Sequence, residues 1–163
     1  MNLNVYREVK SWKKPLHFTR TNLAKTYLKL IPNIQVIAIA GSVGKTLTQN
    51  AISSVLSQKY SAVVGEENLD PTFRIPQTIL KAKPWDKYLI LEYGVEHPHD
   101  MDHYLKITKP KIGVMTVLSA EHTKYFGDMD GVIKEESKLV YALPKSGYAI
   151  LNADDPLSSI LAS

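Results

Sequence analysis

Apolar residues recur along the chain in two spacings, one typical of strands and one typical of helices. Residues 34–40 form a mostly apolar, β-branched run that ends at a glycine, which predicts a strand buried on both faces. Shorter apolar runs predict further strands at Ser61–Val64, Tyr88–Leu91, Ile112–Val117 and Tyr148–Leu151. Helical spacing predicts helices between Lys45 and Tyr60 and at Ile75–Lys83, Met101–Ile107 and Met129–Leu143. Strands that alternate with helices indicate an α/β fold with a doubly wound, mainly parallel sheet flanked by helices.

An additional amphipathic helix is predicted at Thr21–Leu30, before Pro32. The residues expected to pack against the rest of the protein are Leu23, Ala24, Tyr27, Leu28 and Ile31. Residues 1–30 carry seven Lys or Arg and one Glu, a net charge of +6 against +4 for the whole chain. This basic arm could contact nucleic acid or anionic lipid. The interleaved apolar residues favour a packed helix with a solvated basic face, so we expect no nucleic-acid partner.

The composition narrows the class of protein. At 163 residues the chain is long enough for one domain with its own hydrophobic core. The absence of cysteine excludes disulfides, a thiol nucleophile and a zinc–thiolate site. No apolar run approaches the roughly 20 residues that cross a bilayer, and the N-terminus lacks the apolar stretch of a secretory signal. We therefore expect a cytoplasmic protein with no membrane span.

A glycine-rich turn follows the first predicted strand and leads into a helix. Such a turn presents backbone N–H groups and the positive end of a helix to an anion. A lysine in the turn adds charge for the outer phosphates of a nucleotide, and a threonine hydroxyl can bind magnesium. The residues that we expect to bind the nucleotide are Gly41, Ser42, Val43, Gly44, Lys45, Thr46 and Leu47. Because Ile39 stands where the usual pattern has its first glycine, an ordinary strand-to-helix turn is the alternative.

Two more candidate residues follow predicted strands. Glu92 ends the run that begins at Tyr88, and His122 follows the run Ile112–Val117. Ligands of parallel sheets bind at the carboxyl ends of the strands, where both side chains are expected, and Glu92 would lie near the glycine-rich turn if its strand neighbours the first one. Glu92 could bind Mg²⁺ directly or through water, and His122 could bind a second metal, orient a phosphate or act as a base. The alternatives are a solvated acid and a structural histidine.

Histidines and aspartates cluster at residues 97–103. These ligand types suit a transition metal, but the ligands of a metal must also converge in space. Asp100 has the sequence position of a helix N-cap. We therefore expect the start of a helix here rather than a metal site.

Five segments of the chain, in order, resemble the central ATP-binding domain of the Mur ligases, a family that joins amino acids or dipeptides to the UDP-muramyl precursor of peptidoglycan. The segments are 38–48, Leu91-Glu92-Tyr93-Gly94, 109–116, Glu121-His122 with Phe126-Gly127, and 151–155. The loop variant at 41–46, with Asn68-Leu69-Asp70 and Ile75-Pro76, looks most like the branch that adds D-alanyl-D-alanine. The resemblance implies a P-loop-type fold. It implies a C-terminally incomplete central domain at 34–163, preceded by a basic helical arm at 1–33.

The resemblance also implies ATP and Mg²⁺ as cofactors and ATP-dependent amide formation as the reaction. A substrate carboxylate attacks the γ-phosphate to give an acyl phosphate and ADP, and an incoming amine then displaces phosphate. The catalytic residues implied by the family's motifs are Lys45, Glu92 and His122. Thr46 and Glu92 match ligands of the ATP-bound magnesium, and His122 matches a ligand of a second one. The implied partners are ATP, a UDP-muramyl-peptide-type acceptor and an amino acid or dipeptide.

Two positions depart from the family's pattern. Many Mur ligases have a carbamylated lysine near the second metal, and Glu136 stands at the matching position. Lys138 lies on a different face of the predicted helix. We hypothesise that the Glu136 carboxylate replaces the carbamate as a metal ligand; the alternative is a degraded site. Arg74, just before Ile75-Pro76, stands where a glycine is common, which affects the substrate loop.

Mur ligases normally have an N-terminal domain that binds the UDP-sugar and a C-terminal domain that closes over ATP. Neither is recognisable in these 163 residues, so we expect weak or no ligase activity from this chain alone. One alternative is a non-catalytic or truncated nucleotide-binding module. Another is an unrelated P-loop NTPase or GTPase, which is disfavoured because the sequence contains no Asn-Lys-x-Asp segment for guanine recognition.

Overall fold

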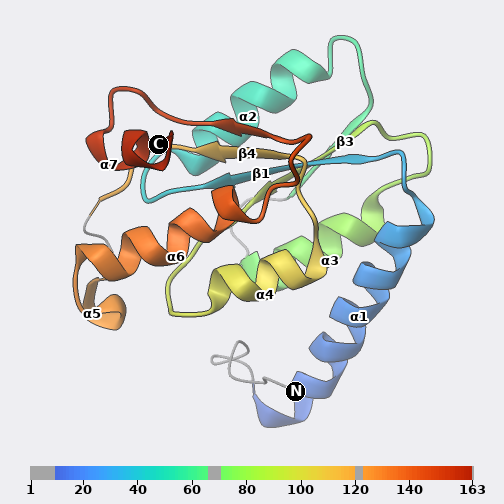
Figure 1. The fold of residues 1–163 in the computed structure, drawn as a ribbon. Helices are drawn as coiled ribbons and strands as arrows, with labels where there is room; N and C mark the ends of the chain where they lie inside the picture. Colours follow the sequence, from blue (N-terminus) through green and yellow to red (C-terminus); the bar gives the residue numbers. More distant parts are fainter. Residues whose placement is uncertain (1–9, 66–70, 120–122, 163) are drawn as a thin grey trace.

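Five strands form a parallel sheet at the centre of the computed structural model, which describes residues 10–65, 71–119 and 123–162 (Figure 1). The strands are β1 (Gln35–Ala40), β2 (Ala62–Val64), β3 (Tyr88–Glu92), β4 (Ile112–Met115) and β5 (Tyr148–Ile150). Their order is β2-β3-β1-β4-β5, and each neighbouring pair is parallel. The prediction of an α/β fold with a parallel sheet is confirmed. Because β1 lies between β3 and β4, its carboxyl end lies between theirs.

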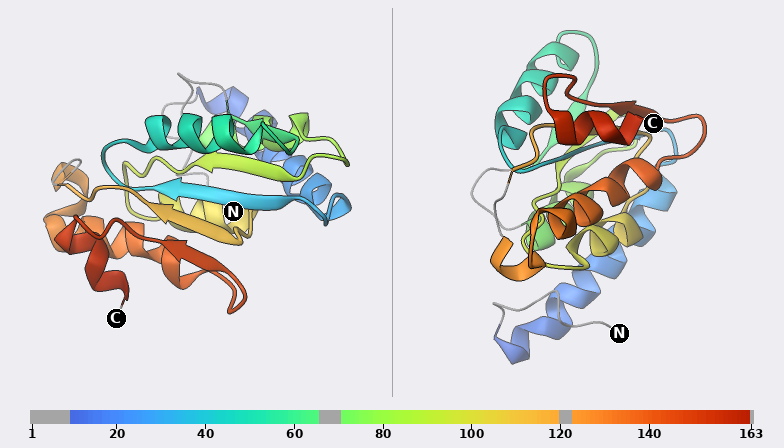
Figure 2. Two further views of the ribbon diagram at one scale, coloured as in Figure 1. Left: turned by 90° about the horizontal axis from the view of Figure 1, so that it is seen from above. Right: turned by 60° about the vertical axis from the view of Figure 1, so that its left-hand side comes forward.

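Helices cover both faces of the sheet (Figure 2). Helix α2 (Lys45–Leu56) lies on one face. The longer helices on the other face are α1 (Lys14–Leu30), α3 (Pro71–Lys81), α4 (Asp100–Ile107) and α6 (Met129–Tyr141). The short helices are η2 (Ser11–Lys13), α5 (Thr123–Phe126), α7 (Pro156–Ser159) and η3 (Ile160–Ala162). None of the helices in the described ranges combines the length and the apolar character needed to cross a bilayer.

The two faces of the sheet differ in how fully they are covered. The larger core lies under α1, α3, α4 and α6 and includes Ala24, Ala38, Ile79, Leu91, Met101 and Leu139. On the other face, Ile37, Ile39, Ile90 and Val114 pack against α2. An apolar groove remains between α2 and β5, where Val55 is 72% exposed and Ile150 is 54% exposed. The helical spacing predicted after Lys45 is confirmed, but α2 covers only part of its side of the sheet.

Helix α1 is longer than the predicted Thr21–Leu30 helix and packs against α3 and α4. Ala24 and Ile31 are buried, and the Tyr27 hydroxyl donates a hydrogen bond to the carbonyl of Ala82 at 2.6 Å. The prediction that Leu23 packs inward is wrong, because its side chain is 57% exposed. Leu23 precedes Leu28 by five residues, which places it about 140° around the helix from the packed side.

Two other local predictions differ from the structure. Helix α3 begins at Pro71 rather than Ile75 and contains Pro76, with six of its side chains buried against the body of the protein. Helix α4 has His99 as its N-cap, in the left-handed region at φ 74°, so the prediction of Asp100 as the N-cap is wrong. The Asp100 carboxylate instead accepts the N–H groups of Glu96 and His97, at 3.2 and 2.8 Å. Asp100 therefore stabilises the turn before the helix.

Candidate phosphate-binding site

The loop between β1 and α2 has a conformation that requires its glycines. Gly41 and Gly44 have φ angles of 117° and 86°, which residues with side chains rarely adopt. A Cβ atom at Gly41 would also collide with the Thr116 side chain. The Ser42 N–H donates to the Val117 carbonyl at 2.7 Å, and the Ser42 hydroxyl accepts the Ser119 N–H at 2.9 Å. The loop is therefore held in place by the segment that follows β4.

The start of α2 provides donors for an anion. Gly44 is the N-cap of this helix and no side chain caps it, so the first N–H groups of α2 lack an acceptor within the helix. The helix dipole adds partial positive charge at the same point. The Lys45 ammonium group lies over the loop, where it donates to the carbonyls of Gly41 at 2.6 Å and Ser42 at 2.8 Å. This combination suits a phosphate group.

Glu92 lies beside this loop, as its position at the end of β3 predicts. Strand β3 pairs directly with β1, so Glu92 stands opposite Ile39. The Thr46 hydroxyl donates a hydrogen bond to Glu92 Oε2 at 2.9 Å. The structure thus brings together two oxygen-bearing side chains that the sequence selected as magnesium ligands. That role itself stays a prediction.

Arg74 is a member of this site that the sequence analysis did not predict. Its guanidinium group lies 3.3 Å from Glu92 Oε2, and both side chains are buried. The sequence identified Arg74 only as a departure from the family's glycine. A signal was present, because an arginine on the buried face of a helix needs a charged partner. The partner could not be named, since no local pattern shows that α3 crosses the end of β3.

Glu136 contacts the opposite end of the loop. Its carboxylate accepts the N–H group of Gly41 at 3.3 Å, and its side chain is 3% exposed. Burial raises the pKa of Glu136 to about 7, although the Lys45 charge and the Gly41 hydrogen bond act in the other direction. Lys138 points elsewhere and pairs with Asp102 and Glu135, each at 2.7 Å. The two residues thus face different surroundings, as expected from their helical spacing.

Several predicted positions do not enter this geometry. His122 and Glu121 lie outside the described residues, as does the segment 66–70, so the structure does not test them. Within the described residues no three His, Asp or Glu side chains gather as a metal site. In the cluster at 97–103, His99 and Asp102 form a pair at 3.0 Å.

Asp155 has a structural role that the sequence analysis did not assign. It belongs to the last segment of the family resemblance, at 151–155. Its Oδ2 atom accepts the N–H groups of Leu118 at 3.0 Å and Ser158 at 3.1 Å. One buried carboxylate thus caps α7 and fixes the chain just after β4. The point that it fixes lies between Val117 and Ser119, which hold the glycine-rich loop at 41–46, called the phosphate loop below.

A glycine loop at the carboxyl end of the central parallel strand, followed by an uncapped helix, defines a phosphate-binding α/β domain. Residues 39–163 match the Mur ligase middle domain, and the chain belongs to this family. This finding confirms the resemblance inferred from the five sequence segments.

Curated relatives agree with this assignment. The chain is 31% identical over 121 residues to the UDP-N-acetylmuramoyl-tripeptide–D-alanyl-D-alanine ligase of Escherichia coli, an alignment that covers 74% of this chain and 27% of that protein. It is 32% identical over 129 residues to the ligase of the same name from Mycobacterium tuberculosis H37Rv, covering 79% of this chain and 25% of the relative. The chain therefore spans about a quarter of the length of these relatives.

Solved structures show the same fold. MurF from Acinetobacter baumannii superimposes with a TM-score of 0.82 at 24% identity, over 89% of this chain and 32% of that one. The MurF ligase of Thermotoga maritima in complex with ADP superimposes with a TM-score of 0.79 at 25% identity, over 86% of this chain and 33% of that one.

Proposed function

We propose that the chain is the ATP-binding module of an ATP-dependent amide ligase in peptidoglycan precursor synthesis. The observation that carries this proposal is the uncapped start of α2 with the Lys45 ammonium group above it, beside the Thr46–Glu92 pair. The relatives' names support D-alanyl-D-alanine as the amine and a UDP-muramyl tripeptide as the acceptor. The ADP complex of the Thermotoga maritima neighbour supports an adenine nucleotide as the ligand of the loop.

The residues present fit a magnesium ion beside the nucleotide. Thr46 and Glu92 supply oxygen ligands within 2.9 Å of each other, and Mg²⁺ prefers oxygen ligands. When bound, Mg²⁺ would neutralise phosphate charge and hold the phosphates in place. Arg74 contacts the same Glu92 oxygen. When Mg²⁺ binds, the guanidinium group would therefore either keep its contact with this carboxylate beside the ion or move away from it. His122 and Glu136 remain proposed ligands of a second magnesium.

The chain's own groups account for phosphate binding and charge stabilisation. The N–H groups at the start of α2 would hold the phosphate oxygens, while Lys45 would exchange its carbonyl contacts for a phosphate oxygen. Fixed donors of this kind stabilise the charge that develops on a transferred phosphoryl group. Transfer to a substrate carboxylate would give an acyl phosphate and ADP, and an amine would then displace phosphate. A cytoplasmic location is part of the proposal, because ATP is a cytoplasmic cofactor.

A nucleotide titration tests the local part of the proposal. Isothermal titration with ATP and Mg²⁺ should show binding to the chain, and Lys45→Ala should weaken it by about tenfold or more. The matched control is Lys145→Ala, which removes an exposed lysine after α6 and should leave the affinity unchanged. Equal affinity of the Lys45 variant and the parent would remove the loop as the nucleotide site.

An activity assay tests the reaction. The chain, joined to the flanking domains of a related ligase, should release ADP only when both the UDP-muramyl tripeptide and D-alanyl-D-alanine are present. Nucleotide binding without any ADP release from this chimaera would favour the alternative of a non-catalytic binding module. These 163 residues expressed by themselves are expected to be weakly active or inactive, because in this proposal the flanking domains exclude water from the nucleotide.

A further inference from the structure

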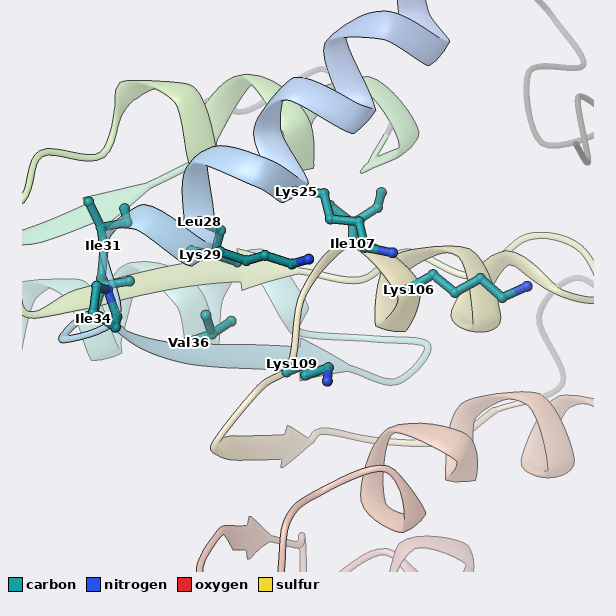
Figure 3. A pocket seen from close by; sticks show the side chains of 10 residues that line it. Lys25, Leu28, Lys29, Ile31, Ile34, Val36, Lys106, Ile107 and Lys109 are labelled. Carbon is teal, nitrogen blue, oxygen red and sulfur yellow. The ribbon is translucent and has the colours of Figure 1, made fainter.

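A pocket lies at the amino end of β1, and the phosphate loop follows the carboxyl end of the same strand. Figure 3 shows the side chains that line this pocket. Its volume is about 250 Å³, and it lies where the end of α1, the end of α4 and the start of β1 meet. Its floor is apolar and includes Leu28, Ile31, Ile34, Val36 and Ile107, which are buried or half-buried. The floor therefore suits an apolar group.

Four lysines surround this apolar floor. Lys25 and Lys29 come from α1, Lys106 from α4, and Lys109 from the turn before β4. Figure 3 shows the four lysine side chains beside the apolar residues of the lining. The lining contains no acidic residue, and none of the four lysines forms an ion pair with any residue in the described ranges. Among the residues that the structure describes, no acidic side chain is therefore paired with the positive charge of this rim.

The negative ends of helix dipoles stabilise only two of these four lysines. Lys29 and Lys106 lie in the last turns of α1 and α4, where a cation offsets the partial negative charge of the helix end. Lys25 lies inside α1 and Lys109 lies outside any helix, so neither has this stabilisation. Gathering four like charges around one opening raises the local positive potential and favours an anion.

We propose that this pocket binds a small amphiphilic anion, in which a phosphate or carboxylate group contacts the lysines and a short acyl or aromatic group covers the floor. Known ligand pockets have volumes of about 300–1,000 Å³, so a volume of about 250 Å³, slightly below this range, points to one small apolar group rather than a large ligand. The proposal is independent of nucleotide binding, because the pocket and the phosphate loop lie at opposite ends of β1.

Octyl phosphate is the probe for this pocket, with two compounds that each lack one of its features. Inorganic phosphate has the charge without the chain, and octyl glucoside has the chain without the charge. Octyl phosphate should bind with a dissociation constant at least about tenfold below that of either compound. In isoleucine-methyl NMR spectra its titration should shift Ile31, Ile34 and Ile107, which line the pocket, and leave Ile39 and Ile90 unshifted.

A charge variant with a matched control tests the lysines. The double variant Lys25→Gln/Lys109→Gln should raise the dissociation constant of octyl phosphate at least about tenfold. Neither residue lies in the last turn of a helix, so helix stability is preserved. The control, Lys87→Gln/Lys145→Gln, removes the same charge from two exposed lysines outside the pocket and should bind like the parent.

The outcomes separate the possible sources of the anion. Binding of free octyl phosphate at the pocket methyls supports the proposal. Equal affinity for octyl phosphate and octyl glucoside, or for octyl phosphate and inorganic phosphate, would overturn it. Binding to vesicles that contain phosphatidylglycerol together with octyl phosphate binding would identify a lipid as one source of the ligand. Binding to those vesicles without octyl phosphate binding would overturn the proposal. It would show that the chain binds anionic membranes through its surface charge and not through a ligand in the pocket.

Discussion

Replacing Glu136 by glutamine removes an ionisable group that the fold buries beside the phosphate loop. Glutamine keeps the shape of the side chain and retains an oxygen that can accept the Gly41 N–H group, which donates to Glu136 at 3.3 Å in the parent. The substitution therefore changes charge and protonation with little change in packing. Its effect on stability should depend strongly on pH.

The sign and size of this effect follow from the pKa of Glu136. The ordinary value is 4.5, and burial raises the pKa to about 7 in the folded protein. Between these values the folded state holds a proton that the unfolded state has released, so the free energy of unfolding falls as pH rises. At about 1.4 kcal/mol for each pH unit, the loss across this window is about 3 kcal/mol. The stability that Glu136 contributes is complete below pH 4.5 and is lost above about pH 7.

Urea unfolding of the parent and of Glu136→Gln between about pH 5 and pH 8 measures this effect. Relative to the parent, the variant should gain about 2.5 kcal/mol of stability between the acid and the alkaline end of this range, because the rest of the change lies below pH 5. Burial, with Arg20 and Lys13 nearby, lowers the pKa of His17 and gives a pH dependence of opposite sign. Both proteins contain His17, so its contribution cancels in the difference.

The matched control is Asp130→Asn, which removes an exposed acid from the first turn of the same helix. Its stability difference from the parent should stay constant over this pH range. A constant difference for Glu136→Gln as well would refute the reasoning, because a carboxylate in this buried position could not then hold its proton near neutral pH.

Three further substitutions test other parts of the site. Gly41→Ala should lower the free energy of unfolding by about 1–3 kcal/mol in thermal unfolding, because the new Cβ meets Thr116 at a φ of 117°. Asp155→Ala should cost about 1–2 kcal/mol in urea unfolding, since it removes the cap of α7. Arg74→Met should cost about 3 kcal/mol, because it leaves Glu92 buried without its cation. MgCl2 should raise the melting temperature of this last variant more than that of the parent; an equal rise would argue against Glu92 as a magnesium ligand.

The sequence predicted features that depend on residues close together in the chain or on the parallel arrangement of the strands. The β-branched run at 34–40 and the glycines of the loop are local signals, and β1 and the loop follow them closely. The approach of Glu92 to Thr46 needed one further condition, that the strands ending at Ala40 and Glu92 are parallel neighbours whose carboxyl ends lie together. The sequence therefore placed Thr46 and Glu92 together beside the loop, and their role in phosphate and magnesium binding stays a prediction.

Features that depend on how helices pack could not be predicted in this way. Leu23 is apolar at a helical spacing, but the side of α1 that is buried depends on where α3 and α4 lie. Aspartate is favourable both at the N-cap and in the first turn of a helix. The presence of Asp100 in the sequence was therefore not enough to predict at which residue α4 begins. Arg74 joins the site only because α3 passes the end of β3.

The central position of β1 affects when the phosphate loop can form during folding. Val36 pairs with Leu89 and Ala40 with Met115, so both partners of β1 are synthesised well after it. Gly41 and the Glu136 carboxylate that contacts it are 95 residues apart in sequence. Contacts of such long range form slowly, because a large loop of chain must close first. A chain emerging from the ribosome therefore completes its phosphate loop only after α6 has been made. Affinity for phosphate would then develop late in folding, and its onset would report that the sheet has assembled.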